Sequence, residues 1–162
     1  MDVFLPDIHA SRNFGFRLGN ALASLAVPVP VFFYGGMGMG KTTIICALVK
    51  TLPGGEKAET SSPSFTLCNL YDTMPPVAHF DLYRQENGTV DESLLDFLDE
   101  ERHVVLVEWA ERLPAFALPP SRIECAISAA SNASGLHDAH GRTVRLKPCG
   151  DMAKKIVAIS GA

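Results

Sequence analysis

The sequence has no excess of basic residues, and this limits the ligands that it can bind by itself. Its 14 Lys and Arg residues are outnumbered by 18 Asp and Glu residues, giving a formal net charge of −4. Proteins that grip nucleic acid directly usually carry a basic excess or stripe, because cationic side chains release counterions from the phosphates. We therefore expect no direct DNA binding, and we expect that any role on RNA depends on a partner protein that contacts the RNA.

Paired cysteine motifs and long apolar runs are also missing. The four cysteines, at positions 46, 68, 125 and 149, form no C-x-x-C and no zinc-type spacing with histidine, so we expect free thiols in a reducing compartment. The most apolar stretch, Leu25–Met39, is interrupted by prolines and glycines and is too short to span a bilayer. The N-terminal residues lack the pattern of a signal peptide. These absences predict a cytoplasmic protein with no membrane contact.

Hydrophobic periodicity predicts one α/β domain over residues 1–162, with a P-loop NTPase-like mixed sheet that has a parallel core and antiparallel additions and is flanked by helices. Helices are expected at Ser11–Leu25, with Ser11 as N-cap, and at Lys41–Leu52, Asp91–Leu98 and Asp151–Ile159. Strands are expected at Val3–Leu5, Val29–Tyr34, Phe65–Tyr71, Val77–Tyr83, His103–Trp109, Arg122–Ala129 and Arg142–Pro148, with a loop at Ala130–Gly141.

The segment Gly35–Thr42 matches the phosphate-binding motif G-x-x-x-x-G-K-S/T at every fixed position. Such a loop surrounds a triphosphate with backbone N–H groups, and the following helix adds its N-terminal N–H groups. Lys41 is expected to reach the β- and γ-phosphates, and Thr42 to offer its hydroxyl to Mg²⁺. The motif predicts ATP and Mg²⁺ as ligands, bound by Gly36, Met37, Gly38, Met39, Gly40, Lys41, Thr42 and Thr43.

One acidic residue follows an apolar strand and is a candidate for the metal side of this site. Glu108 follows four apolar residues, so a buried strand would present its carboxylate at the edge where P-loop proteins hold Mg²⁺. His79, Asp81 and Tyr83 alternate along another strand and share one face. Composition alone leaves two readings of that face open, a solvent-exposed surface or part of a site.

Four blocks together resemble the TsaE family: GGMGMGKTT at 35–43, SPSFTL at 62–67, HFDLYR at 79–84 and LVEW at 106–109. The resemblance covers roughly residues 30 to 115 and implies a cytoplasmic P-loop ATPase, weak alone, of threonylcarbamoyladenosine (t6A) synthesis. It implies action with TsaD and TsaB, which modify adenosine 37 of tRNA, so tRNA would be reached indirectly.

The same resemblance assigns roles to single residues. It implies that Lys41, Glu108 and Asp81 serve catalysis, with Thr42, Glu108 and Asp81 on the metal side and Asp81 orienting water or the metal shell. Trp109 would lie beside the nucleotide, and the Ser62–Thr66 segment near the γ-phosphate could act as a switch. Ser11 and Arg142 are expected to contact the base or the phosphates.

Two other functions fit the motif. A small-molecule kinase would need an acceptor region and an Arg-rich lid, and the second half of the chain predicts strands instead. A nucleotide-gated binding module without useful turnover fits as well, because Asp81 and Glu108 could hold Mg²⁺ without activating water.

Overall fold

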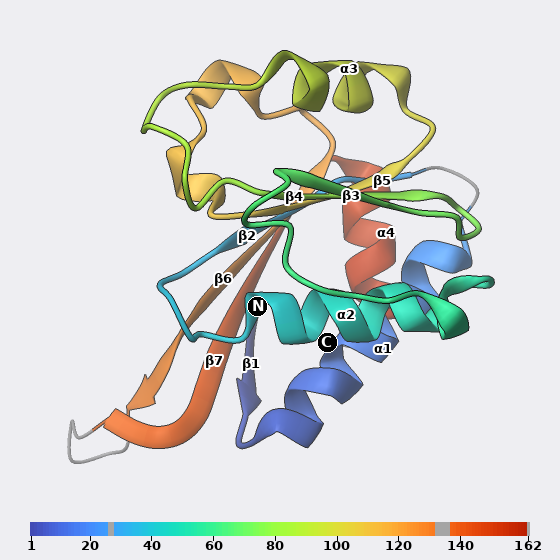
Figure 1. The fold of residues 1–162 in the computed structure, drawn as a ribbon. Helices are drawn as coiled ribbons and strands as arrows, with labels where there is room; N and C mark the ends of the chain where they lie inside the picture. The colour runs from blue at the N-terminus through green and yellow to red at the C-terminus, as the bar shows by residue number, and fades with distance from the viewer. Residues whose placement is uncertain (26–27, 132–136, 162) are drawn as a thin grey trace.

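The computed structural model describes residues 1–25, 28–131 and 137–161 (Figure 1). Its helices are α1 (Ile8–Ala23), α2 (Lys41–Thr51), α3 (Glu92–Glu100) and α4 (Asp151–Ile159), with 3₁₀ turns at Gly55–Lys57, Ala110–Arg112 and Ala115–Ala117. Its strands are β1 (Asp2–Leu5), β2 (Val31–Tyr34), β3 (Cys68–Tyr71), β4 (Val77–Asp81), β5 (Val104–Glu108), β6 (Arg122–Ser131) and β7 (His137–Cys149).

The strands form one seven-stranded sheet in the order β1-β7-β6-β2-β5-β4-β3. Four neighbours, β6, β2, β5 and β4, are parallel, whereas β3 pairs antiparallel with β4, and β7 pairs antiparallel with β6 and β1. The predicted parallel core with antiparallel additions is therefore confirmed. Because parallel strands end at the same edge, the residues that follow β2, β4 and β5 meet there.

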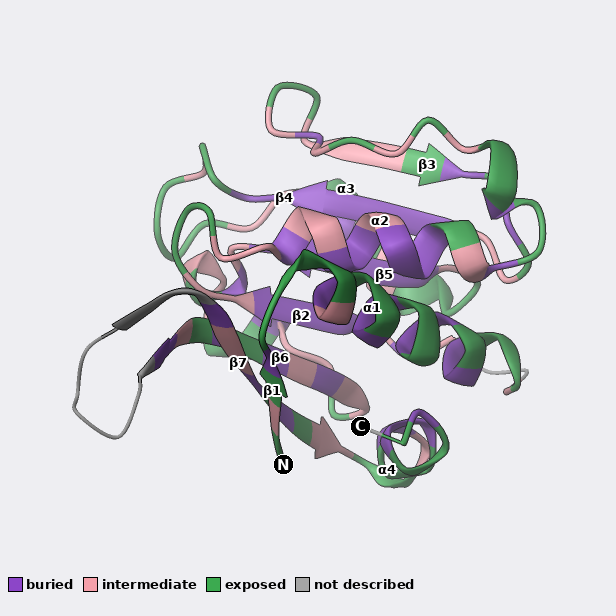
Figure 2. Ribbon diagram, turned by 90° about the horizontal axis from the view of Figure 1, so that it is seen from below, coloured by how far each residue is buried: buried purple, intermediate pink, exposed green. Residues whose placement is uncertain are grey.

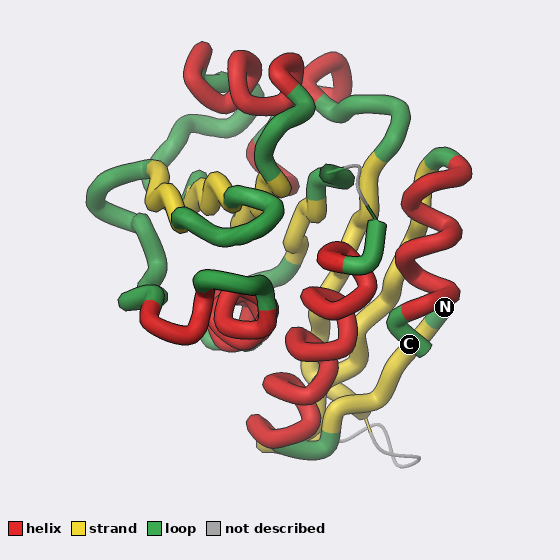
Figure 3. The backbone as a smooth tube through the Cα atoms, turned by 90° about the vertical axis from the view of Figure 1, so that its right-hand side faces the viewer, coloured by secondary structure: helices red, strands yellow, loops and turns green. Residues whose placement is uncertain are grey.

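Helices cover both faces of this sheet (Figures 1 and 3). Helices α1, α2 and α4 lie on one face, and α3 lies on the other (Figure 1). Among the described residues, no helix combines the length and the apolar character needed to cross a membrane.

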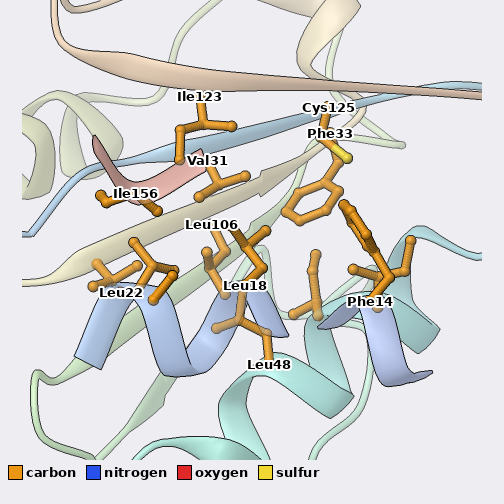
Figure 4. Close-up of a cluster of buried hydrophobic side chains, with 14 of the residues drawn as sticks. Phe14, Leu18, Leu22, Val31, Phe33, Leu48, Leu106, Ile123, Cys125 and Ile156 are labelled. Carbon is orange, nitrogen blue, oxygen red and sulfur yellow. The ribbon is translucent and has the colours of Figure 1, made fainter. Parts of the chain in front are cut away.

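The strand pleat divides the core into two clusters. Phe33 and Leu106 face the larger cluster, which contains Phe14, Leu18 and Leu48 from α1 and α2 (Figure 4). Phe32, Phe80, Val105 and Val107 point the other way and pack with Leu94 of α3. Figure 2 shows the central strands buried and the outer sides of α1 exposed. Side chains alternate along a strand, so His79 and Asp81 point to the same face as Val77, and Glu108 points to the same face as Leu106. This is the face that α1 and α2 cover.

The first helix begins earlier than predicted, and Ser11 is not its N-cap. Asp7 caps α1 by accepting a hydrogen bond from the backbone N–H of Ala10 at 2.8 Å. Ser11 lies inside the first turn, where its hydroxyl donates to the carbonyl oxygen of Asp7 at 3.1 Å. Asp7 is as good a cap as Ser11, so the apolar spacing did not locate the true first turn.

Strand boundaries also differ from the prediction. The third strand starts at Cys68 because residues 64–66 form a turn, and β4 ends at Asp81 rather than Tyr83. The expected loop at Ala130–Gly141 is partly strand, since β6 reaches Ser131 and β7 begins at His137; residues 132–136 lie outside the described residues. The long antiparallel pairing of β6 with β7 stabilises the described residues of this segment as strands through backbone hydrogen bonds, although their own β-propensity is weak.

Candidate nucleotide and magnesium site

The turn between β2 and α2 has the form of a phosphate cradle. Gly40 stands at the N-cap of α2 with φ of 95°, a conformation that strains any residue with a Cβ. A Cβ built at Gly36, Gly38 or Gly40 would meet nothing within 4 Å, so the loop surrounds open space. The free N–H groups of the first turn of α2 adjoin the same space, which suits an anion.

Lys41 points back into this loop. Its Nζ donates to the carbonyl oxygens of Gly35 and Gly36, the latter at 3.0 Å, and lies 3.9 Å from the centre of the Trp109 ring. Only 4% of Lys41 is exposed. Burial lowers the pKa of this ammonium from its ordinary value, although the carboxylates of Glu108, Glu111 and Asp81 oppose the shift. The motif lysine thus lies inside the cradle.

Glu108 ends β5 beside Thr42, the first-turn threonine of α2. The Thr42 hydroxyl lies 2.8 Å from Oε1 and 3.0 Å from Oε2 of Glu108, and only 2% of Glu108 is exposed. Adjacent parallel strands explain the approach, because β5 pairs directly with β2, which leads into the loop. The predicted metal-side pair is therefore brought together.

Asp81 lies opposite Glu108 in the pairing of β4 with β5, yet it has partners of its own. One carboxylate oxygen accepts a hydrogen bond from the hydroxyl of Ser62, and the other accepts one from the backbone N–H of Tyr83 at 2.9 Å. Asp81 is 5% exposed. Of the three residues predicted to share this face, His79 and Asp81 are buried, whereas Tyr83 lies beyond the end of β4 and is exposed.

These groups surround a cavity of about 400 Å³. Tyr83 and Trp109 form one wall, with ring centres 5.1 Å apart. The Ser62–Thr66 segment contributes Ser62 and Ser64 on another side. The cavity is lined by Met37, Gly38, Met39, Gly40, Lys41, Thr42, Thr43, Ser62, Ser64, Asp81, Tyr83, Glu108 and Trp109.

A second hollow of about 360 Å³ adjoins the loop on its α1 side and contains the two remaining predicted residues. Ser11 and Arg142 line it together, although they lie 131 positions apart in the chain (142 − 11). They share it with Gly38, Met39, Gly40 and Thr43 of the loop, and with Asp7 and Ile8. The hollow therefore continues the phosphate cradle toward the start of α1.

The donors at this edge suit Mg²⁺ better than a transition metal. Thr42 and Glu108 offer oxygen atoms, the ligand type that a hard cation prefers. Within the described part of the chain, no three His, Cys, Asp or Glu side chains gather as a metal cluster. Mg²⁺ commonly takes one or two carboxylates and completes its shell with water and substrate phosphates, so these residues fit it.

Sequence reasoning assigned no role to His79, and the structure gives it a place in the site. Its Nε2 lies 3.0 Å from Oε1 of Glu108, and the side chain is fully buried. The available signal was its position two residues before Asp81 in a strand, which puts both on one face. The sequence pattern does not single out Asp7, which lines the second hollow, because Ser11 is an equally good candidate for the N-cap.

The sheet order, the loop between β2 and α2, and the acidic strand ends together define a protein of the P-loop nucleotide-binding class. The family model "Threonylcarbamoyl adenosine biosynthesis protein TsaE" matches residues 5–137. The chain belongs to the TsaE family.

Two known proteins illustrate the similarity. A "tRNA threonylcarbamoyladenosine biosynthesis protein TsaE" from Aquifex aeolicus is 33% identical over 114 residues, which covers 69% of this chain and 81% of the relative. The crystal structure of YdiB from Bacillus subtilis aligns with a TM-score of 0.73 at 20% identity, covering 99% of this chain and 93% of the other. The second likeness concerns the fold alone.

Proposed function

We propose that the protein binds ATP with Mg²⁺ and hydrolyses it, slowly by itself, as the ATPase subunit required for t6A modification of tRNA at adenosine 37. The observation that carries this is the contact between Thr42 and Glu108 beside an open glycine cradle, in a chain of the TsaE family. A loop of N–H donors recognises phosphate, and the oxygen pair beside it suits the accompanying cation.

Each residue of the proposed machinery has one task. Lys41 holds the β- and γ-phosphates as a point charge, and its ammonium has a third N–H donor besides the two that contact the carbonyl oxygens of Gly35 and Gly36. Thr42 and Glu108 would hold Mg²⁺, whose charge would neutralise part of the phosphate charge. The Trp109 ring, already beside Lys41, limits access of water from that side.

Asp81 is proposed to orient the attacking water or to complete the metal shell. Its carboxylate is held by Ser62 and by the backbone of Tyr83, and it lies opposite Glu108 in the sheet. A carboxylate whose oxygens already accept hydrogen bonds is restrained in orientation, which suits positioning of a water molecule. The Ser62–Asp81 contact also ties the Ser62–Thr66 segment to the site.

The remaining parts of the nucleotide are proposed to extend into the hollow between Ser11 and Arg142. This hollow shares Gly38, Met39, Gly40 and Thr43 with the phosphate cavity, so one ligand can occupy both. Arg142 would supply positive charge there, and Ser11 a hydroxyl.

We infer that the partners are TsaD and TsaB, that tRNA is reached through them, and that the site of action is the cytoplasm. The Aquifex aeolicus relative is named for t6A biosynthesis of tRNA, which supports the pathway. The acidic net charge of −4 supports an indirect contact with tRNA.

The test is phosphate release from ATP and Mg²⁺ by the purified protein, with and without the TsaD–TsaB pair. We expect slow release alone and faster release with the pair, and none from a Lys41→Ala variant in either case. Release that requires a small acceptor molecule would instead identify a kinase. Nucleotide binding with no release in any mixture would identify a binding module.

A further inference from the structure

We propose that His79 is a positioning residue for the metal side of this site: its Nε2–H holds the Glu108 carboxylate in the orientation that Mg²⁺ requires. This inference rests on the ATPase function proposed above. It concerns a residue that the phosphate-binding motif does not contain, on a strand that does not border the loop.

His79 reaches Glu108 across two neighbouring parallel strands. In the pairing of β4 with β5, His79 lies opposite Leu106 and Asp81 lies opposite Glu108. The His79 side chain therefore points to the same face as Glu108 from a position nearer the start of the strand. Its Nε2 approaches Oε1 at 3.0 Å, while the Thr42 hydroxyl approaches the same carboxylate from α2.

The hydrogen-bond pattern fixes the tautomer. An ionised carboxylate only accepts hydrogen bonds, so the contact requires the proton on Nε2 of His79. The Nδ1 atom is buried and finds no hydrogen-bond partner among the residues that the structure describes. A proton on Nδ1 would thus be a buried donor without an acceptor, which is costly. The geometry therefore places a proton on Nε2, toward Glu108.

A purely structural residue would not need this chemistry. The ring is fully buried beside Tyr71, with ring centres 6.5 Å apart. Burying an imidazole with one nitrogen unpaired costs free energy that a leucine of similar volume would avoid. The hydrogen bond to Glu108 offsets part of that cost and at the same time restrains the orientation of the carboxylate. Groups that orient metal ligands in this way typically change metal affinity or activity 10- to 100-fold when removed.

The experiment compares Mg²⁺ dependence in the full chain and its His79→Leu variant. Binding of ADP carrying a mant fluorophore is followed by energy transfer from Trp109, the only tryptophan, first in EDTA and then in a Mg²⁺ titration. Phosphate release from ATP is measured over the same titration. We expect the Mg²⁺ concentration for half-maximal release to rise about tenfold or more. Affinity for the nucleotide in EDTA should stay within about twofold, because the cradle itself is untouched.

Two amide variants separate hydrogen bonding from packing. Glutamine can place its N–H₂ group near the Nε2 position, whereas the shorter asparagine reaches only the Nδ1 position. His79→Gln should therefore restore most of the Mg²⁺ dependence, and His79→Asn should behave like the leucine variant. This pair keeps the test decisive even if His79→Leu does not fold.

His103 provides a matched control. It also has a buried Nδ1 without a hydrogen-bond partner in the described part of the chain, and it packs edge-on against Phe97 at 4.8 Å between ring centres. However, it precedes β5 and so lies at the opposite end of that strand from Glu108. His103→Leu should leave the Mg²⁺ titration unchanged.

The outcomes distinguish this inference from the function on which it rests. Superimposable Mg²⁺ titrations for the wild-type protein and His79→Leu would overturn the role of His79 and leave the ATPase function standing. The same holds if His79→Gln and His79→Asn respond alike, or if His103→Leu shifts as much as His79→Leu. A wild-type protein that binds no nucleotide with or without Mg²⁺ would overturn both.

Discussion

The hydroxyl of Thr42 lies 2.8 Å from Oε1 and 3.0 Å from Oε2 of Glu108, so one side chain contacts both oxygens of the carboxylate. These residues are 66 positions apart in the chain and meet because β5 pairs with β2. This contact holds the two oxygen donors near each other, which reduces the ordering that metal binding would otherwise require.

Thr42→Ala should raise the Mg²⁺ concentration that ATP turnover requires, with a smaller effect on nucleotide binding itself. The change deletes a hydroxyl at the carboxylate and leaves the glycine loop intact. We expect the Mg²⁺ concentration for half-maximal phosphate release to rise by roughly tenfold or more. A Mg²⁺ titration of phosphate release measures it.

Thr42→Ser is the matched control because it keeps the hydroxyl and removes only a methyl group. Its titration should stay close to that of the wild-type protein. If alanine and serine variants respond equally, the hydroxyl is not a metal-side donor.

Gly15→Ala should destabilise the protein through the contact between α1 and α2. A Cβ at Gly15 would run into the carbonyl oxygen of Ile44 and lie 2.8 Å from the Cβ of Ala47. Both are part of a packed helix, so one element must shift, and overpacking of this kind costs about 1–3 kcal/mol. Urea unfolding measures the loss in the free energy of unfolding.

Asn13→Ala is the matched control, on the exposed side of the same helix. It should change the free energy of unfolding by less than about 0.5 kcal/mol. Equal stability of the two variants would contradict the packing argument.

Much of the fold could be predicted because its signals are local. The apolar run before the glycine loop indicated β2, and Val104–Val107 followed by a carboxylate indicated β5. The locations of these two strands follow from their runs of buried apolar residues and from the residues that end them, and both signals are visible in the sequence. The expectation that Ser11 and Arg142 contact the nucleotide came from the family resemblance and not from the local pattern; the structure places both at one hollow.

What the sequence did not reveal depends on contacts between distant segments. The first turn of α1 is set by Asp7, and the long β6–β7 pair continues through residues expected to form a loop. The sequence shows His79 only as a polar residue in a strand, and its contact with Glu108 depends on the pairing of β4 with β5. Strand order is a property of the whole sheet, so no window of sequence contains it.

Glu124 should contribute to stability at neutral pH and lose that contribution in acid. Burial raises its pKa, but hydrogen bonds and charges from Lys147 and Arg122 outweigh this and leave the pKa below its ordinary value of 4.5. Arg122 lies 2.6 Å and Lys147 3.0 Å from its carboxylate. Since the folded-state pKa is depressed, the stabilisation is complete above the unfolded-state pKa and disappears as the pH falls through the folded-state value.

The check on Glu124 is urea unfolding of the wild-type protein and Glu124→Gln over a pH series. At pH 7 we expect the variant to be less stable by up to about 1 kcal/mol, because the group is partly exposed and solvent screens the pairs. The difference should shrink steadily below pH 4.5. A difference that is independent of pH would show that packing, not charge, is responsible.

Asp81→Asn should abolish most ATP turnover while leaving nucleotide binding nearly intact. Asparagine keeps the size of the side chain and can still accept the hydrogen bond from the N–H of Tyr83, which lies 2.9 Å from the carboxylate in the wild-type protein. It removes the negative charge that would act on water or on the metal shell, so we expect phosphate release to fall about 100-fold or more. ADP affinity should change by less than about threefold, since a group that acts in hydrolysis adds little to ground-state binding.

Ser62→Ala separates the charge of Asp81 from the attachment of the Ser62–Thr66 segment, because it breaks the contact with Asp81 but keeps the carboxylate. Its loss of turnover should be the smaller one. Wild-type turnover in Asp81→Asn would exclude the proposed role, and an equal loss in Ser62→Ala would assign the effect to the Ser62–Thr66 segment.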